Sequence, residues 1–148
     1  MSSRCRAAAL KFLKIRLRSV YELREKLSGK GFEPREIEGE LEYLKSIDLL
    51  NDRAFTASWI AYRLARPFGF KRIAIELRQK GIDENLIGEA IKAAQAEYVE
   101  ADAALELAAR RAERLGSIDP QKKKKRVGDF LLRRGYPLDM VIKIVKKI

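Results

Sequence analysis

The sequence predicts an all-α protein, an elongated array of three tandem three-helix repeats. Apolar residues recur at intervals of three and four, as they do on one face of a helix. No segment alternates apolar and polar residues over the length of a strand. One motif occurs three times along the 148 residues, and such self-similarity is the mark of a repeat protein.

The repeated motif is a basic residue, a glycine and an apolar residue at the end of a helical pattern. It occurs at Lys30-Gly31-Phe32, Lys80-Gly81-Ile82 and Arg134-Gly135-Tyr136. In all three copies the residues four and eight places before the glycine, and six, ten and thirteen after it, are apolar. Glycine suits the left-handed position that follows a helix. The motif therefore predicts a helix, a tight turn and a second helix in each repeat.

Capping residues mark several of the predicted helix starts. Ser19 and Glu22 have the spacing of a capping box. Asp119 suits an N-cap, and Pro34 and Pro137 suit the first position of a helix. These signals place helix starts where the repeated apolar pattern requires them.

A third helical pattern precedes each pair of helices, so each repeat should hold three. These first helices are expected at about residues 4–16, 51–65 and 98–115. The predicted repeats are residues 1–47, 48–97 and 98–148. Because residues 84–115 contain no proline, one continuous helix joining the second and third repeats remains an alternative. Units of this size bury little alone and should stack, which would create a concave basic face.

The composition points to an anionic partner. Lys and Arg number 32 against 21 Asp and Glu, a formal net charge of +11, which favours a polyanion or an acidic protein surface. Cys5 is the single cysteine and there is no histidine, which excludes a disulfide within the chain and a Cys/His zinc site. The sequence shows no signal peptide or membrane span. We expect a cytoplasmic protein that does not bind membranes.

No group of residues suggests catalysis. Ser19 and Ser28 lack a histidine base, and no glycine-rich phosphate loop or Walker-type lysine occurs. We therefore expect no enzymatic activity, no cofactor, no metal and no small-molecule substrate.

The aromatic residues of the second repeat allow two interpretations. Phe55, Trp59 and Tyr62 are spaced by four and three residues, which is more typical of a core stripe than of a platform for stacked bases. Phe68 and Phe70, on either side of a glycine, leave both interpretations open.

Several motifs together resemble one known family, the RecX regulatory proteins. Residues 16–27 followed by Lys30-Gly31-Phe32 resemble its first repeat, and residues 50–55 and 69–82 resemble its second. Residues 130–136 resemble its third repeat. The sequence departs from the family's pattern at Asn51, at Thr56 and in the run Lys122-Lys123-Lys124-Lys125-Arg126. The resemblance covers nearly the whole chain in the correct order.

This resemblance implies a function that periodicity alone does not give. It implies a modulator that binds in the helical groove of the RecA recombinase filament on single-stranded DNA. Such a modulator usually restrains ATP hydrolysis and strand exchange during DNA repair and recombination, and we expect this chain to act as a monomer. Two alternatives stay open, a stand-alone basic DNA-binding helical module and a helical scaffold for another acidic protein.

The candidate residues for contact with the filament or with DNA are basic side chains of the three repeats. They are Arg16, Arg18, Arg24, Lys26, Lys71, Arg72, Arg78, Lys122, Lys123, Lys124, Lys125, Arg126 and Arg133. The alternative interpretation is that they are solvated flanks of helices, and Lys30, Lys80 and Arg134 are better explained as complements of a helix C-terminus. We favour contact for Lys71, Arg72 and Arg133. The run 122–126 is expected to meet an anion, because adjacent like charges repel.

Overall fold

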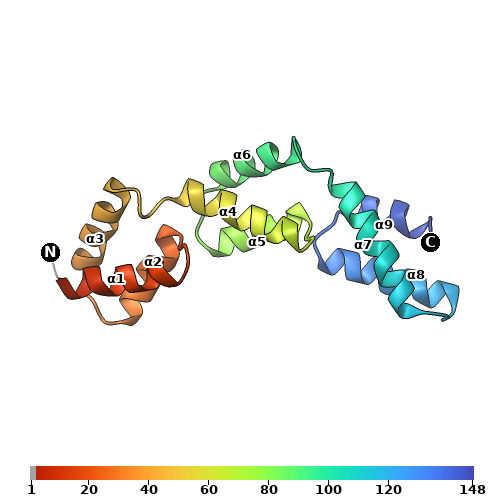
Figure 1. The fold of residues 1–148 in the computed structure, drawn as a ribbon, viewed down its shortest axis with the longest axis horizontal. Coiled ribbons are helices and arrows are strands. Elements are labelled where there is room, and N and C mark those ends of the chain that lie inside the picture. The colour runs from red at the N-terminus through yellow and green to blue at the C-terminus, as the bar shows by residue number, and fades with distance from the viewer. Residues whose placement is uncertain (1–2) are drawn as a thin grey trace. The chain divides into compact units, whose positions relative to one another are not determined.

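The computed structural model describes residues 3–148, and over these residues it contains nine α-helices and no strand. The all-α prediction is confirmed (Figure 1). The helices are α1 (Ser3–Ile15), α2 (Val20–Gly29), α3 (Pro34–Ser46), α4 (Asp52–Ala65), α5 (Phe70–Gln79), α6 (Glu84–Gln95), α7 (Glu100–Leu115), α8 (Pro120–Arg133) and α9 (Leu138–Val145). The first predicted repeat begins with residues 1 and 2, which lie outside the described residues.

The helix starts follow the capping signals. The Ser19 hydroxyl accepts a hydrogen bond from the Glu22 N–H at 3.1 Å, and the Glu22 carboxylate accepts one from the Ser19 N–H at 3.1 Å. This is the predicted capping box. Asp119 caps α8, and Pro34 is the first residue of α3. Pro137 lies one residue earlier than predicted, at the N-cap of α9.

The three motif glycines adopt the left-handed conformation that the sequence predicted. Their φ angles are 90° at Gly31, 74° at Gly81 and 94° at Gly135. After each glycine, the next N–H donates to the carbonyl five residues earlier, at 3.1 to 3.4 Å. This closed turn ends one helix and leads into the next.

The alternative of one helix over residues 84–115 is wrong. Helix α6 ends at Gln95 and α7 begins at Glu100. Val99 is the extended N-cap residue of α7, and Glu100 and Asp102 lie in the first turn of that helix. Acidic residues there favour a helix start, because they face the positive end of the helix dipole.

The chain divides into two compact units. The first contains the residues up to Trp59 together with Leu77–Ile87, and the second contains Ile60–Glu76 and Gly88–Ile148. The division passes through the second group of three helices, because α4, α5 and α6 each contribute residues to both units. Stacking of the repeats into an elongated array, with the predicted boundaries, remains a prediction.

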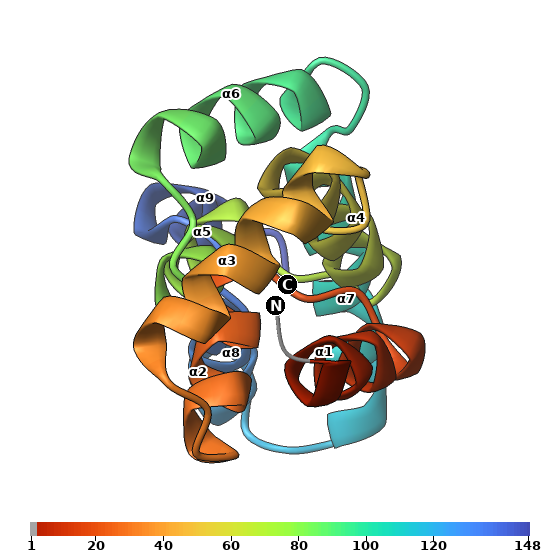
Figure 2. The ribbon, with the colours of Figure 1, turned by 90° about the vertical axis from the view of Figure 1, so that its left-hand side faces the viewer.

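Each unit has its own apolar core. In the first unit α1, α2 and α3 pack against one another in all pairings (Figure 2). The buried residues of this core are Cys5, Ala9, Leu23, Leu27, Ile37, Leu41, Leu44 and Leu50. In the second unit α7, α8 and α9 enclose Ala104, Ala108, Val127, Leu131, Tyr136, Val141 and Ile144. Most of these are positions of the repeated apolar pattern. No helix within residues 3–148 has the length and apolar character needed to span a membrane.

Candidate partner-binding surface

A loop-on-turn contact, here called the first junction, joins residues 16–22 to the turn at residues 80–82. The Ser19 hydroxyl donates a hydrogen bond to the Lys80 carbonyl at 2.7 Å. A Cβ atom on Gly81 would lie 2.3 Å from the Cβ atom of Tyr21. Glycine is therefore required at position 81 by close packing as well as by its φ angle.

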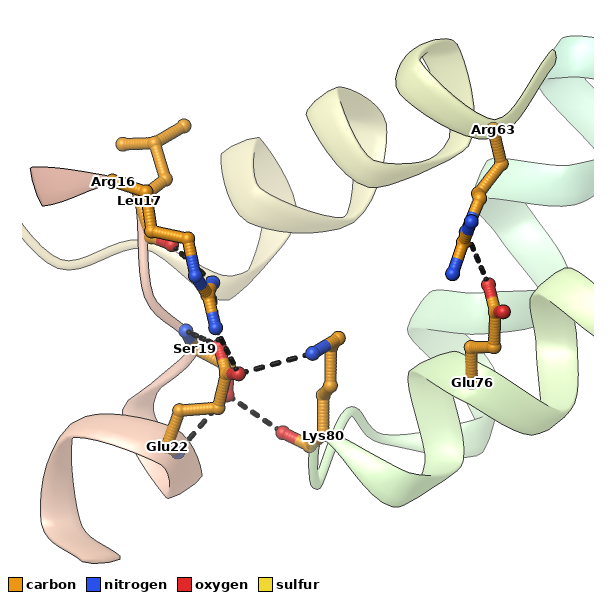
Figure 3. Close-up of polar contacts among 7 residues, drawn as sticks. All are labelled: Arg16, Leu17, Ser19, Glu22, Arg63, Glu76 and Lys80. Atoms are coloured by element: carbon orange, nitrogen blue, oxygen red, sulfur yellow. Dashed lines mark hydrogen bonds and ion pairs between the residues drawn. The ribbon is translucent and has the colours of Figure 1, made fainter. Parts of the chain in front are cut away.

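Two ion pairs stabilise the first junction. Arg16 and Lys80 converge on Glu22, at 2.7 Å and 3.0 Å (Figure 3). Burial would raise the pKa of Glu22, but the hydrogen bonds from Arg16, the Ser19 N–H and Lys80 outweigh burial and lower this pKa to about 2. Arg16 thus has a structural partner. Lys80, expected to complement a helix end, pairs instead with a glutamate 58 residues away in the sequence.

The other candidates of the first unit have different surroundings. Arg24 pairs with Glu38 at 2.8 Å, and Arg78 pairs with Glu84. Arg18 is half-buried 5.8 Å from the Phe12 ring centre, and burial with the nearby Arg16 guanidinium lowers its pKa.

Lys26 is exposed and makes no ion pair among the described residues. The structure therefore does not bring the first-unit candidates together into one unpaired cationic patch.

The second unit contains a matching contact, the second junction, between residues 66–72 and the turn at residues 134–136. The Gly69 N–H donates to the Arg134 carbonyl at 2.7 Å, and the Arg72 guanidinium donates to the Arg133 carbonyl at 2.9 Å. A Cβ atom on Gly69 would lie 2.2 Å from the Gly135 carbonyl oxygen. The two backbones touch here, whereas at the first junction the Ser19 side chain makes the hydrogen bond to the turn.

Phe68 lies at the centre of an arginine cluster. The guanidinium carbons of Arg63, Arg72 and Arg134 lie 4.6, 4.7 and 4.5 Å from its ring centre, within cation–π range. Glu76 pairs with Arg63 at 2.8 Å (Figure 3). It also pairs with Arg72 at 3.5 Å. Burial and the nearby Arg72 and Arg63 lower the pKa of Arg134, although Tyr136 opposes this. The arginines surround this ring, so it offers little room to a stacked base.

Of the aromatic residues of α4 and α5, some lie in the core and one lies at the surface. Phe55 is buried and stacks with Trp59 at 6.1 Å, and Phe70 is buried against Tyr98. Tyr62 departs from the expected core stripe because 49% of it is exposed, and its ring lies 5.5 Å from the Arg66 guanidinium. The spacing identified the helix face correctly but not the point at which that face meets solvent.

Three candidates do come together at the second junction. Lys71, Arg72 and Arg133 line a groove of about 340 Å³. Its apolar lining includes Ile75, Leu132 and Leu138, which are 45%, 42% and 60% exposed. Sequence reasoning missed these apolar residues. Their signal was available, because Ile75 and Leu132 lie off the repeated apolar pattern.

The basic run at residues 122–126 occupies the first half of α8. Lys125 pairs with Asp129 at 3.3 Å and is 77% exposed, so this pair contributes little. The other four side chains make no ion pair within residues 3–148. The predicted excess of positive charge is therefore present at this helix start. The described residues contain no group of acidic or cysteine side chains suited to a metal ion.

The nine helices of residues 3–148, with a left-handed glycine turn in each group of three, are those of a helical-repeat protein. Models of the first, second and third three-helix domains of RecX match residues 5–44, 51–91 and 98–145. The chain belongs to the RecX family of regulatory proteins.

Relatives of known name agree with this assignment. Regulatory protein RecX of Amycolatopsis mediterranei is 34% identical over 137 residues, covering 91% of this chain and 77% of the relative. The Chlorobium limicola protein of the same name is 31% identical over 143 residues, covering 96% and 87%. The crystal structure of RecX from Lactobacillus salivarius matches with a TM-score of 0.81 and 26% identity, over 98% of this chain and 94% of that one.

Proposed function

We propose that this chain binds the RecA recombinase filament on single-stranded DNA, in its helical groove, and restrains ATP hydrolysis and strand exchange during DNA repair and recombination. The observation that carries this proposal is the unbroken succession of three RecX domains along the chain. The relatives compared above are regulatory proteins by name. The proposal places its action in the cytoplasm, as a monomer and without catalysis of its own.

The charge distribution supports a partner that contains both protein and DNA. The net charge is +11, yet Arg16, Arg24 and Arg78 are paired within the chain. Cations that make no ion pair among the described residues include Lys71 and Arg133 at the second junction and Lys122, Lys123, Lys124 and Arg126 on α8. Phosphates attract such groups through release of counterions. An acidic protein surface also attracts these cations, because its charge is negative.

A second function, a stand-alone DNA-binding module, is favoured by one observation. The run at residues 122–126 is exposed or half-exposed and largely unpaired, as expected of residues that bind phosphates. The two functions differ in what they require, because a stand-alone module binds bare DNA tightly without recombinase.

The proposal is tested by the DNA-dependent ATPase of the cognate recombinase. We expect substoichiometric amounts of this chain to slow that ATPase, because a filament can be affected beyond the subunit that is contacted. The chain alone should hydrolyse no nucleotide. Unchanged ATPase activity and unchanged filament length across a broad titration would contradict the proposal.

A further inference from the structure

The two junctions lie at matching positions of the repeated motif but differ in their surfaces. Alignment on the motif glycines pairs Lys71, Arg72 and Ile75 with Tyr21, Glu22 and Glu25, and Leu132, Arg133 and Leu138 with Arg78, Gln79 and Glu84. At these aligned positions the first half of the chain has mostly polar side chains, and Glu22, Arg78 and Glu84 are held in ion pairs. The loop-on-turn contact of the first junction therefore forms with other side chains at these positions. The aliphatic and cationic lining of the second junction is consequently not required by the contact itself.

The cations of this groove are only partly compensated. Lys71 and Arg133 are exposed and make no ion pair among the described residues. Arg72 has an ion pair with Glu76 at 3.5 Å, but Glu76 also pairs with Arg63 at 2.8 Å. One carboxylate thus serves two guanidinium groups. The groove retains positive charge for an external anion.

The apolar lining distinguishes a protein partner from a nucleic acid. Ile75, Leu132 and Leu138 are aliphatic and exposed by 40% or more, and their burial would be favourable. Nucleic-acid bases, in contrast, bind to proteins mainly by stacking on aromatic rings. The nearby ring of Phe68 already faces three arginines. An aliphatic lining suits an aliphatic side chain of a protein.

We infer that this groove binds an acidic protein segment carrying an aliphatic anchor, with the anchor against Leu132 and Leu138 and the acidic groups beside Lys71 and Arg133. This inference rests on the proposed function, so the segment belongs to the recombinase subunit of the filament. The groove therefore binds the protein part of the filament, and the basic run on α8 binds the DNA.

The apolar half of the inference is tested with one matched pair of variants. Leu138→Ser removes a groove residue at the start of α9, and Val99→Ser removes an equally exposed residue at the start of α7, the two being 60% and 62% exposed. Affinity is measured for a filament assembled with a non-hydrolysable nucleotide. We expect Leu138→Ser to weaken binding by about tenfold, as loss of an interface anchor does. Val99→Ser should bind like wild type. Equal binding by the two variants overturns the inference.

The role of the groove cations is tested with a control variant in which the net charge changes by the same amount. K71E/R133E reverses the groove cations, and R4E/K14E reverses two exposed cations of α1 that make no ion pair among the described residues. K71E/R133E should lose filament affinity by more than the control, while both variants lose bare single-strand affinity equally. A larger loss on bare DNA for K71E/R133E would assign the groove to phosphates and overturn the inference.

A photoreactive amino acid at position 138 identifies the occupant directly. We expect it to cross-link to the recombinase subunit in the assembled filament. Cross-links to DNA or to a second copy of this chain would overturn the inference, even if filament binding is intact. Failure of wild type to bind filaments at all is a separate result, because it removes the proposed function and with it the identity of the partner.

Discussion

At the scale of single residues, a few positions hold the junctions together. Gly81 has a φ of 74° and no room for a Cβ atom beside Tyr21. Glu22 completes a capping box and also forms ion pairs with two cations. The motif itself predicted the left-handed glycine. The contact between residues 19 and 80 could not be predicted, since no sequence pattern relates a hydroxyl to a carbonyl 61 positions away.

Substitution of Gly81 tests the turn. Gly81→Val should lower the free energy of unfolding by about 2 kcal/mol or more, because valine is strained at positive φ and its Cβ would overlap Tyr21. Urea denaturation measures this effect. Gly88→Ala is the control, since that helical glycine has open space around it and should gain up to about 1 kcal/mol. A Gly81→Val protein as stable as wild type would show that the turn is different.

The pH dependence of stability tests Glu22. Its pKa is about 2 in the folded chain, against about 4.3 when unfolded. Because the folded pKa is depressed, the ionised Glu22 stabilises the fold fully above pH about 4.5 and loses that contribution as the pH falls toward about 2.

Glu22→Gln should therefore lower the melting temperature at pH 7, with a smaller deficit relative to wild type near pH 3. Glu25→Gln changes an exposed neighbour with no ion pair among the described residues and should track wild type. A constant deficit for Glu22→Gln across this pH range would rule out the ionic role.

At the scale of helices, the pattern predicted the nine helices found within residues 3–148, because each helix carries its own apolar stripe or start signal. Local signals were weaker between α6 and α7, where neither glycine nor proline marks the break. They also failed for Tyr62, whose exposure depends on the surroundings of α4 and not on its spacing. For the candidate site, residue type identified Lys71, Arg72 and Arg133. Only folding brings them beside Leu132 and Leu138.

The basic run of α8 is tested by its salt dependence. Replacing its four lysines by Gln should weaken binding to bare single-stranded DNA and lower the slope of log affinity against log salt by up to about 0.7 per lost phosphate contact. Helicity should survive, because Gln forms helices about as well as Lys. A four-lysine control at Lys11, Lys14, Lys92 and Lys143, all exposed, matches the change in charge. Equal slopes for the two variants would mean that the run is only a solvated face.

At the scale of the whole molecule, the chain has 32 basic and 21 acidic residues. Some of the basic side chains form ion pairs within the chain, and others are free to contact a partner. At the first junction Arg16 and Lys80 form ion pairs with Glu22. At the second junction Lys71 and Arg133, and on α8 most of the basic run, make no ion pair among the described residues and are available to a partner. A filament offers acidic protein and phosphate together, whereas bare DNA offers phosphate alone. The proposed function and its alternative therefore predict different binding preferences.

The most direct measurement compares the affinity of the wild-type chain for the assembled recombinase filament and for the same single-stranded DNA without recombinase, at one salt concentration. The filament offers both protein and phosphate contacts, whereas bare DNA offers phosphate contacts alone. The chain should therefore bind the filament at least about tenfold more tightly, as the gain of one or more interface anchors implies. We therefore predict a clear preference for the filament. Equal or tighter binding to bare DNA would contradict the account and favour a stand-alone DNA-binding module.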